Sequence, residues 1–491
     1  MSKHHQRRTP YVWRFAFTLF SIVAAPTASA AVEPAQPNIL LIYTDDQAYD
    51  AVHALGGAEI ETPNLDRLAR RGTTFSHAYN MGAWHGAVCV ASRTMLNTGR
   101  FLWYAHQDEP HLADKYVAAN RLWSQQLHQA GYHTFFTGKW HVKCKPDQVF
   151  QTLELRHVRP GMPPTVETSY NRPPATGQDP WSPYDRSLGG YWQGGRHWSE
   201  VVADDVEAYF QQVAQRDQPF FMYVAFNAPH DPRQSPKEYV DRYPWQRITV
   251  PESFLPEYPF NEAMGAGHLL RDERLAPFPR TKRAVQTHRA EYYAIISHLD
   301  VQVGRILDAL QQSGRADNTY VFFTSDHGLA CGRHGLMGKQ NMFDHSVRVP
   351  LLFSGPNIPA GKTIDAPVYL QDVMPTSLEL ASVEIPDQVQ FRSLLPLVRG
   401  ERTKSYDAIY GAYMDRQRMV TVGNWKLILY PTIAKVLLFD LKNDPHEIHN
   451  LADQPEHQAT VARLFAELQK LQQTTGDTLD LSESFPELAK K

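Results

Sequence analysis

The stretch Asn-Ile-Leu-Leu-Ile-Tyr-Thr-Asp-Asp at residues 38–46 decides the fold class of this chain. Its apolar run is uninterrupted, which is typical of a strand buried on both faces of a parallel sheet. Similar runs recur at residues 220–226, before Asn-Ala-Pro-His, and at residues 320–324, before Ser-Asp-His-Gly. Each run ends in polar residues, and helical patterns lie between the runs. This order predicts an α/β fold, in which ligands bind at the carboxyl ends of the strands.

Two helices are predicted between these strands. Thr62-Pro63-Asn64 opens a short helix that Gly72 ends, with the proline at the first helical position. A longer helix is predicted over residues 289–314, because its apolar side chains recur at helical spacing. These are Tyr293, Ile296, Leu299, Val303, Ile306 and Leu310.

The sequence changes character near residue 400. Short strand-like runs at 419–422, 426–430 and 436–439 precede an amphipathic helix, whose apolar residues are Val461, Leu464, Phe465, Leu468 and Leu471. We therefore predict a larger catalytic domain at residues 36–399 and a small C-terminal α+β domain at residues 400–485.

The first 30 residues predict a cleaved signal peptide. Four cationic residues come first: Lys3, Arg7, Arg8 and Arg14. An apolar run at 15–25 follows, and Ala28-Ser29-Ala30 offers a signal-peptidase site. The run is too short to span a bilayer and no other long apolar stretch exists, so we expect no membrane span. We expect cleavage after Ala30 and export to the periplasm or the medium; the alternative is a buried N-terminal helix.

Composition excludes several classes of protein. The chain has 491 residues, of which 42% are hydrophobic, 21% charged and 11% aromatic, and its formal net charge is −3. These values are typical of a globular protein and exclude a disordered chain, a collagen and a coiled coil. No basic stripe is present, so we expect no nucleic-acid partner.

Residues at the strand ends supply a candidate metal site. Asp45 and Asp46 follow one predicted strand, and Asp326 and His327 follow another. A carboxylate-rich site without many thiolates favours Ca²⁺ or Mg²⁺, and the imidazole leaves Mn²⁺ open. Taken singly, each aspartate could equally be a helix cap or a turn residue.

A second candidate site lies at Cys89-Val-Ala-Ser-Arg93, which Thr98-Gly99-Arg100 follows. The pattern predicts a turn that enters a short helix ended by Gly99. Backbone N–H groups at the start of a helix favour an anion. A lone buried cysteine is usually a small hydrophobe, but one flanked by an arginine and polar residues is unusual.

This second site resembles the signature of type I sulfatases, C-x-[PA]-S-R followed by TGR. Other segments agree in the family's order: residues 38–46, 62–72, 131–141, 228–232 (A-P-H-D-P), 325–328 (S-D-H-G), 338–350, 425–430 and 438–447. The Ser-Asp-His-Gly variant is closer to the iduronate-sulfatase and choline-sulfatase-like branches than to arylsulfatases. The resemblance implies a large, mostly parallel sheet sandwiched by helices, as in the alkaline-phosphatase-like fold, with a smaller C-terminal domain.

The resemblance also implies that Cys89 is oxidised after translation to formylglycine by a maturation enzyme. A hydrated aldehyde offers two hydroxyls on one carbon: one attacks sulfur, and the other later expels sulfate by re-forming the carbonyl. Arg93 matches the arginine that steadies this hydrate. The family's metal-ligand positions correspond to Asp45, Asp46, Asp326, His327 and the modified Cys89. The family metal is usually Ca²⁺, which binds a sulfate oxygen and helps to ionise the attacking hydroxyl.

Five further residues match positions of the family around the sulfate group. Lys139 and Lys339 match the cations that hold sulfate oxygens. His141 matches the base that takes a proton from the second hydroxyl, and His230 matches a histidine that can protonate the leaving alcohol. His334 is a candidate for substrate contact, with a structural role as the alternative.

Some residues depart from the family pattern. Ala91 stands where many members have proline, so conversion of Cys89 depends on the maturation system of the host. Asp344 stands where relatives often have glutamate, and we expect a structural hydrogen-bonding role for it. Cys144 and Cys331 form either a disulfide or two free buried thiols.

The sequence therefore predicts a sulfuric ester hydrolase that acts on a sulfated sugar or polysaccharide. The aromatic, proline-rich segment at residues 160–198 and the expected export motivate this substrate, because aromatic rings can stack on sugars; the alternative is that the rings fix a loop to the core. Choline sulfatase, a phosphodiester or phosphonate monoester hydrolase of the same superfamily, and a non-catalytic sulfoglycan-binding protein are the competing hypotheses.

Overall fold

The structure is a computed structural model that describes residues 1, 2, 4, 6–14, 36–153 and 167–490. It has two compact units, residues 1–35 and residues 36–491. The described residues of the first unit are exposed and form neither helix nor strand. The predicted apolar run at 15–25 and the cleavage site after Ala30 lie outside the described residues, as does the beginning of the aromatic segment, residues 160–166. In the described parts of the chain, no helix is long and apolar enough to cross a membrane.

An eight-stranded sheet forms the centre of the second unit, with the strand order β11-β2-β10-β8-β1-β7-β5-β6. Strand β10 runs antiparallel to both of its neighbours, and every other pairing in the sheet is parallel. The strands are β1 (Asn38–Thr44), β2 (Thr73–Phe75), β5 (His133–Gly138), β6 (Thr152–Leu153), β7 (Phe220–Ala225), β8 (Thr319–Ser325), β10 (Leu351–Ser354) and β11 (Lys362–Ile364).

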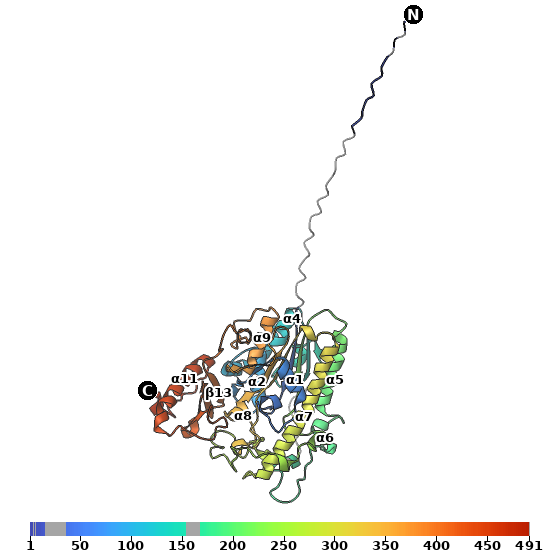
Figure 1. The fold of residues 1–491 in the computed structure, drawn as a ribbon. Coiled ribbons are helices and arrows are strands. Elements are labelled where there is room, and N and C mark those ends of the chain that lie inside the picture. The colour runs from blue at the N-terminus through green and yellow to red at the C-terminus, as the bar shows by residue number, and fades with distance from the viewer. Residues whose placement is uncertain (3, 5, 15–35, 154–166, 491) are drawn as a thin grey trace. The chain divides into compact units, whose positions relative to one another are not determined.

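Helices cover both faces of this sheet (Figure 1). On one face, Leu40 and Ile42 of β1 pack with α1 (Pro63–Arg71), α5 (Trp198–Val213) and α7 (Lys282–Gln312). On the other face, Ile39 and Leu41 pack with α2 (Val88–Thr98), α4 (Trp123–Gln129) and α9 (Val373–Leu380). Alternate residues of β1 thus enter two separate apolar layers, which explains its uninterrupted apolar sequence. The predicted α/β fold with a large, mostly parallel sheet between helices is confirmed.

A second sheet of five strands has the order β16-β15-β14-β13-β4. Strands β13 (Ile409–Tyr413), β14 (Gln417–Val422), β15 (Trp425–Tyr430) and β16 (Lys435–Asp440) are antiparallel neighbours, and α11 (Gln458–Thr475) packs on them. The fifth strand, β4 (Gly82–Ala83), comes from the first part of the chain and pairs parallel with β13. The boundary between residues 399 and 400 stays a prediction.

Gly82 allows the close approach of β4 to β13. Its φ is +96°, and a Cβ placed there would lie 1.9 Å from the carbonyl oxygen of Ala412. Any other residue would combine an unfavourable backbone conformation with a steric clash. The glycine therefore keeps the C-terminal sheet joined to the segment that leads into α2.

The described chain also has smaller elements. They include a three-stranded sheet of β12 (Val368–Tyr369), β3 (Ala78–Tyr79) and β9 (Arg348–Val349), the short helices α3 (Leu102–Asp108), α6 (Lys237–Val240), α8 (Asp344–Val347), α10 (Leu395–Val398) and α12 (Pro486–Ala489), and several 3₁₀ helices such as Glu273–Leu275. The predicted elements are all present, with small differences in their ends. Helix α7 begins at Lys282 rather than at Arg289, because Thr281 caps it by accepting a hydrogen bond from the Ala284 N–H.

Candidate functional site

Four adjacent strands place most of the candidate site residues. Strands β8, β1, β7 and β5 are consecutive in the sheet and run parallel, so their carboxyl ends meet at one edge. Asp326 and His327 directly follow β8, Asp45 and Asp46 follow β1, and Lys139 follows β5. Residues far apart in the sequence thus come together by topology alone.

Cys89 joins this group from the first turn of α2. All eleven residues of α2 are buried, and Gly99, with φ +73°, ends the helix as the sequence predicts. Cys89 therefore lies at the positive end of the helix dipole, which favours a negatively charged group there. Arg93 lies one turn further along and enters the same cluster.

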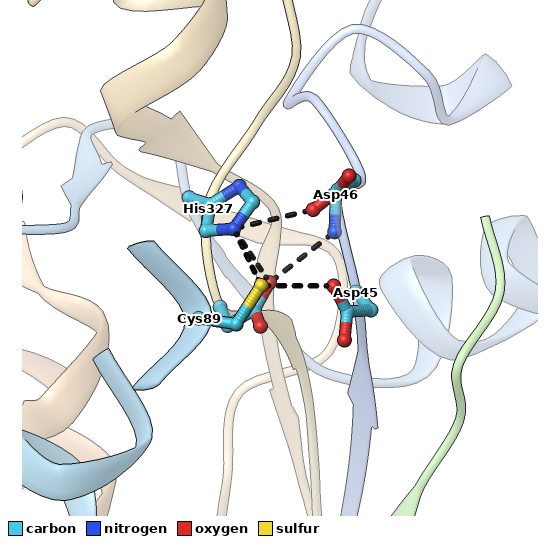
Figure 2. A group of neighbouring side chains, drawn as sticks. Asp45, Asp46, Cys89 and His327 are labelled. Carbon is cyan, nitrogen blue, oxygen red and sulfur yellow. Dashed lines mark hydrogen bonds and ion pairs between the residues drawn. The ribbon is translucent and has the colours of Figure 1, made fainter. Parts of the chain in front are cut away.

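The five predicted metal ligands are brought together. One ligand atom from each of Asp45, Asp46, Cys89, Asp326 and His327 lies within 4.8 Å of the others, and all five residues are buried. The Cys89 sulfur lies 3.3 Å both from Asp45 Oδ1 and from His327 Nε2 (Figure 2). His327 Nε2 is also 3.2 Å from Asp46 Oδ1.

The donor set fits a hard divalent cation. Three carboxylates and an imidazole face one small volume, and oxygen donors of this kind bind Ca²⁺, Mg²⁺ or Mn²⁺. His327 Nδ1 donates a hydrogen bond to the Gly328 carbonyl at 2.9 Å, which leaves Nε2 unprotonated with its lone pair toward the cluster, as a metal ligand requires. Asp46, with φ +72°, turns its carboxylate back toward the same point.

Arg93 forms hydrogen bonds with two of the predicted metal ligands, Asp45 and Asp326. Its Nη2 is 3.1 Å from Asp45 Oδ2, its Nε is 3.2 Å from Asp326 Oδ2, and Nη1 donates to the Lys139 carbonyl at 2.7 Å. The side chain is fully buried and lies over the ring of Tyr43. Because each aspartate bonds Arg93 through one oxygen, the other oxygen remains for a cation.

Two buried lysines flank the cluster. Lys139 pairs with Asp45, and the Lys339 ammonium group lies 2.9 and 2.8 Å from the two oxygens of Asp46. Lys339 Nζ is also 3.1 Å from His230 Nε2. The two ammonium groups therefore lie beside the two carboxylates that follow β1, where an anionic group on a cation would meet them.

Charge and burial set the protonation of the site. Burial favours protonated Asp45, but the charges of Lys139 and Arg93 outweigh it and hold the pKa of Asp45 well below its usual range. Burial and the charge of Asp45 raise the pKa of the Cys89 thiol, so an unmodified Cys89 is a poor thiolate nucleophile.

Both candidate catalytic histidines are neutral near pH 7. Burial, with Lys339, lowers the pKa of His230 to about 4, and burial, with Lys139, lowers the pKa of His141 to about 3. His141 has φ +55°, and its Nδ1 has no hydrogen-bond partner among the described residues. His141 is therefore in the state of a proton acceptor.

His334 has different neighbours from the other candidates. Its Nε2 is 3.0 Å from the Glu447 carbonyl, its Nδ1 is 3.3 Å from His345 Nε2, and its ring stacks on Phe343 at 4.0 Å between ring centres. These contacts join it to a segment near the C-terminal sheet, and they support the structural alternative that the sequence left open. Asp344 has the expected structural role, since it accepts a hydrogen bond from Lys426 Nζ at 2.6 Å.

The structure bears on two pairs of alternatives that the sequence left open, one for the aromatic segment and one for the cysteines. Four aromatic rings of that segment are buried, Trp181, Tyr191, Trp192 and Trp198, while Tyr170 is half-buried and Tyr184 is exposed. Most of these rings therefore hold the loop to the core rather than offering a surface for sugars. Cys144 and Cys331 are free thiols.

Two site residues, Asp231 and Asp272, lack a sequence-based prediction. Asp231 Oδ1 lies 2.9 Å from His230 Nδ1. Asp272 Oδ2 lies 3.6 Å from Lys339 Nζ and accepts a hydrogen bond from Gln340 Nε2 at 2.9 Å. Asp231 follows His230 directly in the A-P-H-D-P segment, which was a usable signal. Asp272 lies in an irregular loop whose sequence has no periodicity to place it.

Comparison with known proteins assigns the family. The sequence matches the family described as "Sulfatase" over residues 37–383 and the one described as "N-sulphoglucosamine sulphohydrolase, C-terminal" over residues 332–474. The chain belongs to the sulfatase family. It is a type I sulfatase of the alkaline-phosphatase-like superfamily, and therefore a sulfuric ester hydrolase.

Two curated relatives cover most of this sulfatase. The uncharacterized sulfatase YidJ of Escherichia coli (strain K12) is 28% identical over 85% of this chain and 83% of its own length. The ulvan-active sulfatase of Formosa agariphila is 27% identical over 95% of this chain and 87% of its own length.

Solved structures share the fold. A protein in complex with its substrate D-glucosamine-2-N,6-O-disulfate aligns with a TM-score of 0.70 and 22% identity, over 91% of this chain and 99% of that one. The phosphonate monoester hydrolase from Silicibacter pomeroyi aligns with a TM-score of 0.72 and 22% identity, over 90% and 96%. At such identities the likeness concerns the fold alone.

Proposed function

We propose that this sulfatase removes sulfate from a sulfated carbohydrate, using a formylglycine made from Cys89 and a bound Ca²⁺. The observation that carries the proposal is the position of Cys89: it lies at the start of α2, 3.3 Å from a carboxylate and 3.3 Å from an imidazole of the candidate metal site. The raised pKa of the thiol makes it a poor nucleophile as it stands, and the C-x-A-S-R context supports its oxidation by a maturation enzyme that accepts Ala91.

The residues of the chain have separate tasks in this proposal. Lys139 and Lys339 bind sulfate oxygens and neutralise the charge that develops on them, while Arg93 holds Asp45, Asp326 and the group at position 89 in place. Neutral His141 accepts a proton from a hydroxyl at position 89. A cation held by Asp45, Asp46, Asp326 and His327 would supply Lewis-acid polarisation of a sulfate oxygen.

His230 requires one further condition to act as a proton donor. With a pKa of about 4 it is unprotonated near pH 7, and the ammonium group of Lys339 donates to its Nε2. A bound sulfate ester adds negative charge next to Lys339, which favours protonation of His230. The proposal therefore assigns proton donation by His230 to the substrate complex.

Relatives support a carbohydrate substrate. One curated relative is an ulvan-active sulfatase, and one structural neighbour holds a disulfated glucosamine. The fold is also shared with a phosphonate monoester hydrolase, and choline sulfate is a smaller alternative substrate. Tyr184, whose ring is exposed, is the residue of the aromatic segment that we propose for contact with a sugar.

Mass spectrometry of the Cys89 peptide, together with a substrate panel, tests the proposal. We expect the mass of formylglycine at position 89 after expression in the native host, and the highest kcat/KM on a sulfated glycan. The panel contains sulfated glycans, an aryl sulfate, choline sulfate and a phosphodiester. A dominant rate on the phosphodiester or on choline sulfate contradicts the carbohydrate assignment, and an unmodified thiol in active enzyme contradicts the formylglycine.

Export and the identity of the metal are tested separately. We propose that residues 1–30 are a signal peptide cleaved near Ala30 and that the enzyme is periplasmic or secreted, as the pattern of charges and apolar residues predicts. N-terminal sequencing of the native enzyme should begin after Ala30. Elemental analysis of purified enzyme should find calcium rather than magnesium or manganese; another stoichiometric metal contradicts that part of the proposal.

A further inference from the structure

Lys339 is carried by a short backbone segment that has few regular hydrogen bonds of its own. Residues 336–338 follow a turn, and the carbonyl oxygens of Met337 and Gly338 accept hydrogen bonds from the N–H groups of Cys331 and Ala330. The N–H groups of the same two residues point to the other side. Because buried N–H groups need partners, the other side of the segment must supply acceptors.

Glu273 supplies both acceptors. Its Oε2 accepts from the Met337 N–H at 2.9 Å, and its Oε1 accepts from the Gly338 N–H at 2.8 Å. The side chain is 1% exposed, so no water competes for these bonds. One carboxylate thus holds the two peptide groups that precede Lys339.

Arg280 makes this buried carboxylate tolerable. Its Nη2 lies 2.5 Å from Glu273 Oε2, its Nη1 donates to the Glu273 carbonyl at 2.8 Å, and its Nε donates to the Gly335 carbonyl at 3.1 Å. The Arg280 side chain is fully buried. The pair therefore connects the loop before α7 to the segment of Lys339 at both of its ends, Gly335 and Gly338.

The packing leaves this segment no room to move toward the loop. A Cβ on Gly338 would lie 2.6 Å from Gln340 Oε1, 2.9 Å from Asp272 Cβ and 3.0 Å from Glu273 Oε1. The backbone of Gly338 therefore lies directly on the Asp272–Glu273 turn. The Lys339 ammonium group contacts Asp46 and His230. The backbone before Lys339 and its ammonium group are therefore held by different parts of the chain.

We propose that Glu273 is a positioning residue of this sulfatase: its carboxylate fixes the backbone that carries Lys339 and so sets the place of the Lys339 ammonium group in the sulfate site. The Glu273 carboxylate bonds to the Met337 and Gly338 N–H groups and to Arg280, rather than to the Lys339 ammonium group. The inference rests on the proposed role of Lys339 in binding sulfate. It adds a residue from the short 3₁₀ helix Glu273–Leu275 to a site whose other residues come mainly from the strand ends and from α2.

Binding of inorganic sulfate to the matured, metal-loaded enzyme, measured by calorimetry, tests the inference. The variants are Glu273→Gln, Lys339→Met, the double variant and Asp477→Asn. In Glu273→Gln an amide NH₂ group replaces one acceptor oxygen. It then faces another hydrogen-bond donor, either a backbone N–H group or Arg280, so a hydrogen bond is lost. We expect its sulfate affinity and its kcat/KM to fall by about 10- to 100-fold, the usual effect of losing a supporting residue.

Asp477→Asn is the control, because it alters a similar buried pair of carboxylate and arginine that is not bonded to the segment of Lys339. Asp477 also accepts from a buried arginine, since Arg418 Nε lies 2.6 Å from its Oδ2. Asp477→Asn should lower the melting temperature and leave sulfate affinity unchanged. In the double variant we expect no further loss beyond Lys339→Met, because Glu273 acts through Lys339.

The outcomes separate the inference from the function on which it rests. If Lys339→Met leaves sulfate binding unchanged, the assigned role of Lys339 is wrong and the inference falls with it. If Lys339→Met weakens binding but Glu273→Gln does not, or if the two losses add fully, the inference alone is overturned.

A second measurement uses the unaltered enzyme, so that misfolding of a variant cannot hide the answer. Hydrogen exchange should show the amides of Met337 and Gly338 protected as strongly as those of β8, since both are buried and bonded to Glu273. Rapid exchange of this peptide overturns the inference.

Gly338→Ala, which pushes the segment away from the loop, should weaken sulfate binding as Glu273→Gln does, and unchanged binding argues against the proposal.

Discussion

Replacing Arg93 by methionine should make the stability of this enzyme depend strongly on its divalent cation. Arg93 has two charged hydrogen bonds, at 3.1 Å to Asp45 and 3.2 Å to Asp326, and all three side chains are fully buried. Removing one partner from a buried ion pair costs about 3–5 kcal/mol, because the remaining charge loses its compensation. In Arg93→Met that loss should appear in full only without the cation.

The cation compensates for part of the loss. With Arg93 absent, a positive charge that touched two of the proposed ligands is gone, so the cation should bind about tenfold more tightly or better, an added stabilisation of about 1.4 kcal/mol. Chelation should therefore reduce the unfolding free energy of Arg93→Met by at least that much more than it reduces that of the wild type.

Urea unfolding with excess calcium and with a chelator measures this difference. Arg418→Met is the matched control, because Arg418 is also buried and bonds both oxygens of Asp477, at 2.6 and 2.8 Å, in the C-terminal part of the chain. It should lose stability equally with and without the cation. If chelation affects Arg93→Met and the wild type to the same extent, the carboxylates around Arg93 do not hold a cation and the metal assignment fails.

Three other predictions concern separate features of the molecule. Cys89→Ala should reduce kcat of the metal-loaded enzyme to background while its melting temperature changes by only a few degrees, since Cys89 is a small buried side chain; retained turnover would rule out the proposed nucleophile. Burial raises the pKa of Asp372 to about 7, so the folded state binds a proton more tightly than the unfolded state does. The unfolding free energy should therefore fall as the pH rises from about 4 to about 7, by up to about 1.4 kcal/mol per pH unit. Urea unfolding at pH 5 and pH 7.5 should show a flatter dependence for Asp372→Asn, and equal slopes would contradict the raised pKa. Gly82→Ala should lower the unfolding free energy by about 2 kcal/mol or more, through its positive φ and the clash with the Ala412 carbonyl, and a calorimetric melting temperature equal to that of the wild type would contradict this account.

The sequence predicted the centre of the fold because the relevant signals are local. An apolar run such as residues 38–43 forms a strand buried on both faces, and the structure places its alternate residues in two apolar layers. The helix ended by Gly72 and the helix ended by Gly99 were predictable from single residues at their ends. The pairing of β4 with β13 was not, because two residues carry too little pattern to specify a partner far along the chain.

The candidate site shows the same division. Asp45, Asp46, Asp326 and His327 follow strands, so the rule that sites lie at the carboxyl ends of strands was sufficient to group them. Glu273 begins a three-residue 3₁₀ helix that Asp272 precedes, too short for a periodic pattern to predict. Glu273 accepts from the backbone N–H groups of Met337 and Gly338, and Asp272 accepts from the Gln340 side chain; no local sequence pattern encodes these contacts.

His334 illustrates a further limit of sequence reasoning. Its place in Gly-Arg-His-Gly, close to Lys339 in the chain, left open both a contact with substrate and a structural role. In the structure a positive φ of +53° directs the residue to Glu447 and Phe343. Nearness in sequence does not determine direction where the backbone leaves the ordinary helical and extended regions.

The complete enclosure of α2 has a consequence for how this protein is made. Cys89 is 2% exposed, and β4, a few residues before it, is already paired with a strand from the last hundred residues of the chain. Any enzyme that modifies Cys89 needs an accessible stretch of backbone around it, which the finished molecule does not offer. The modification proposed for Cys89 would therefore take place before β13 pairs with β4, and a chain that folded first would keep its thiol enclosed.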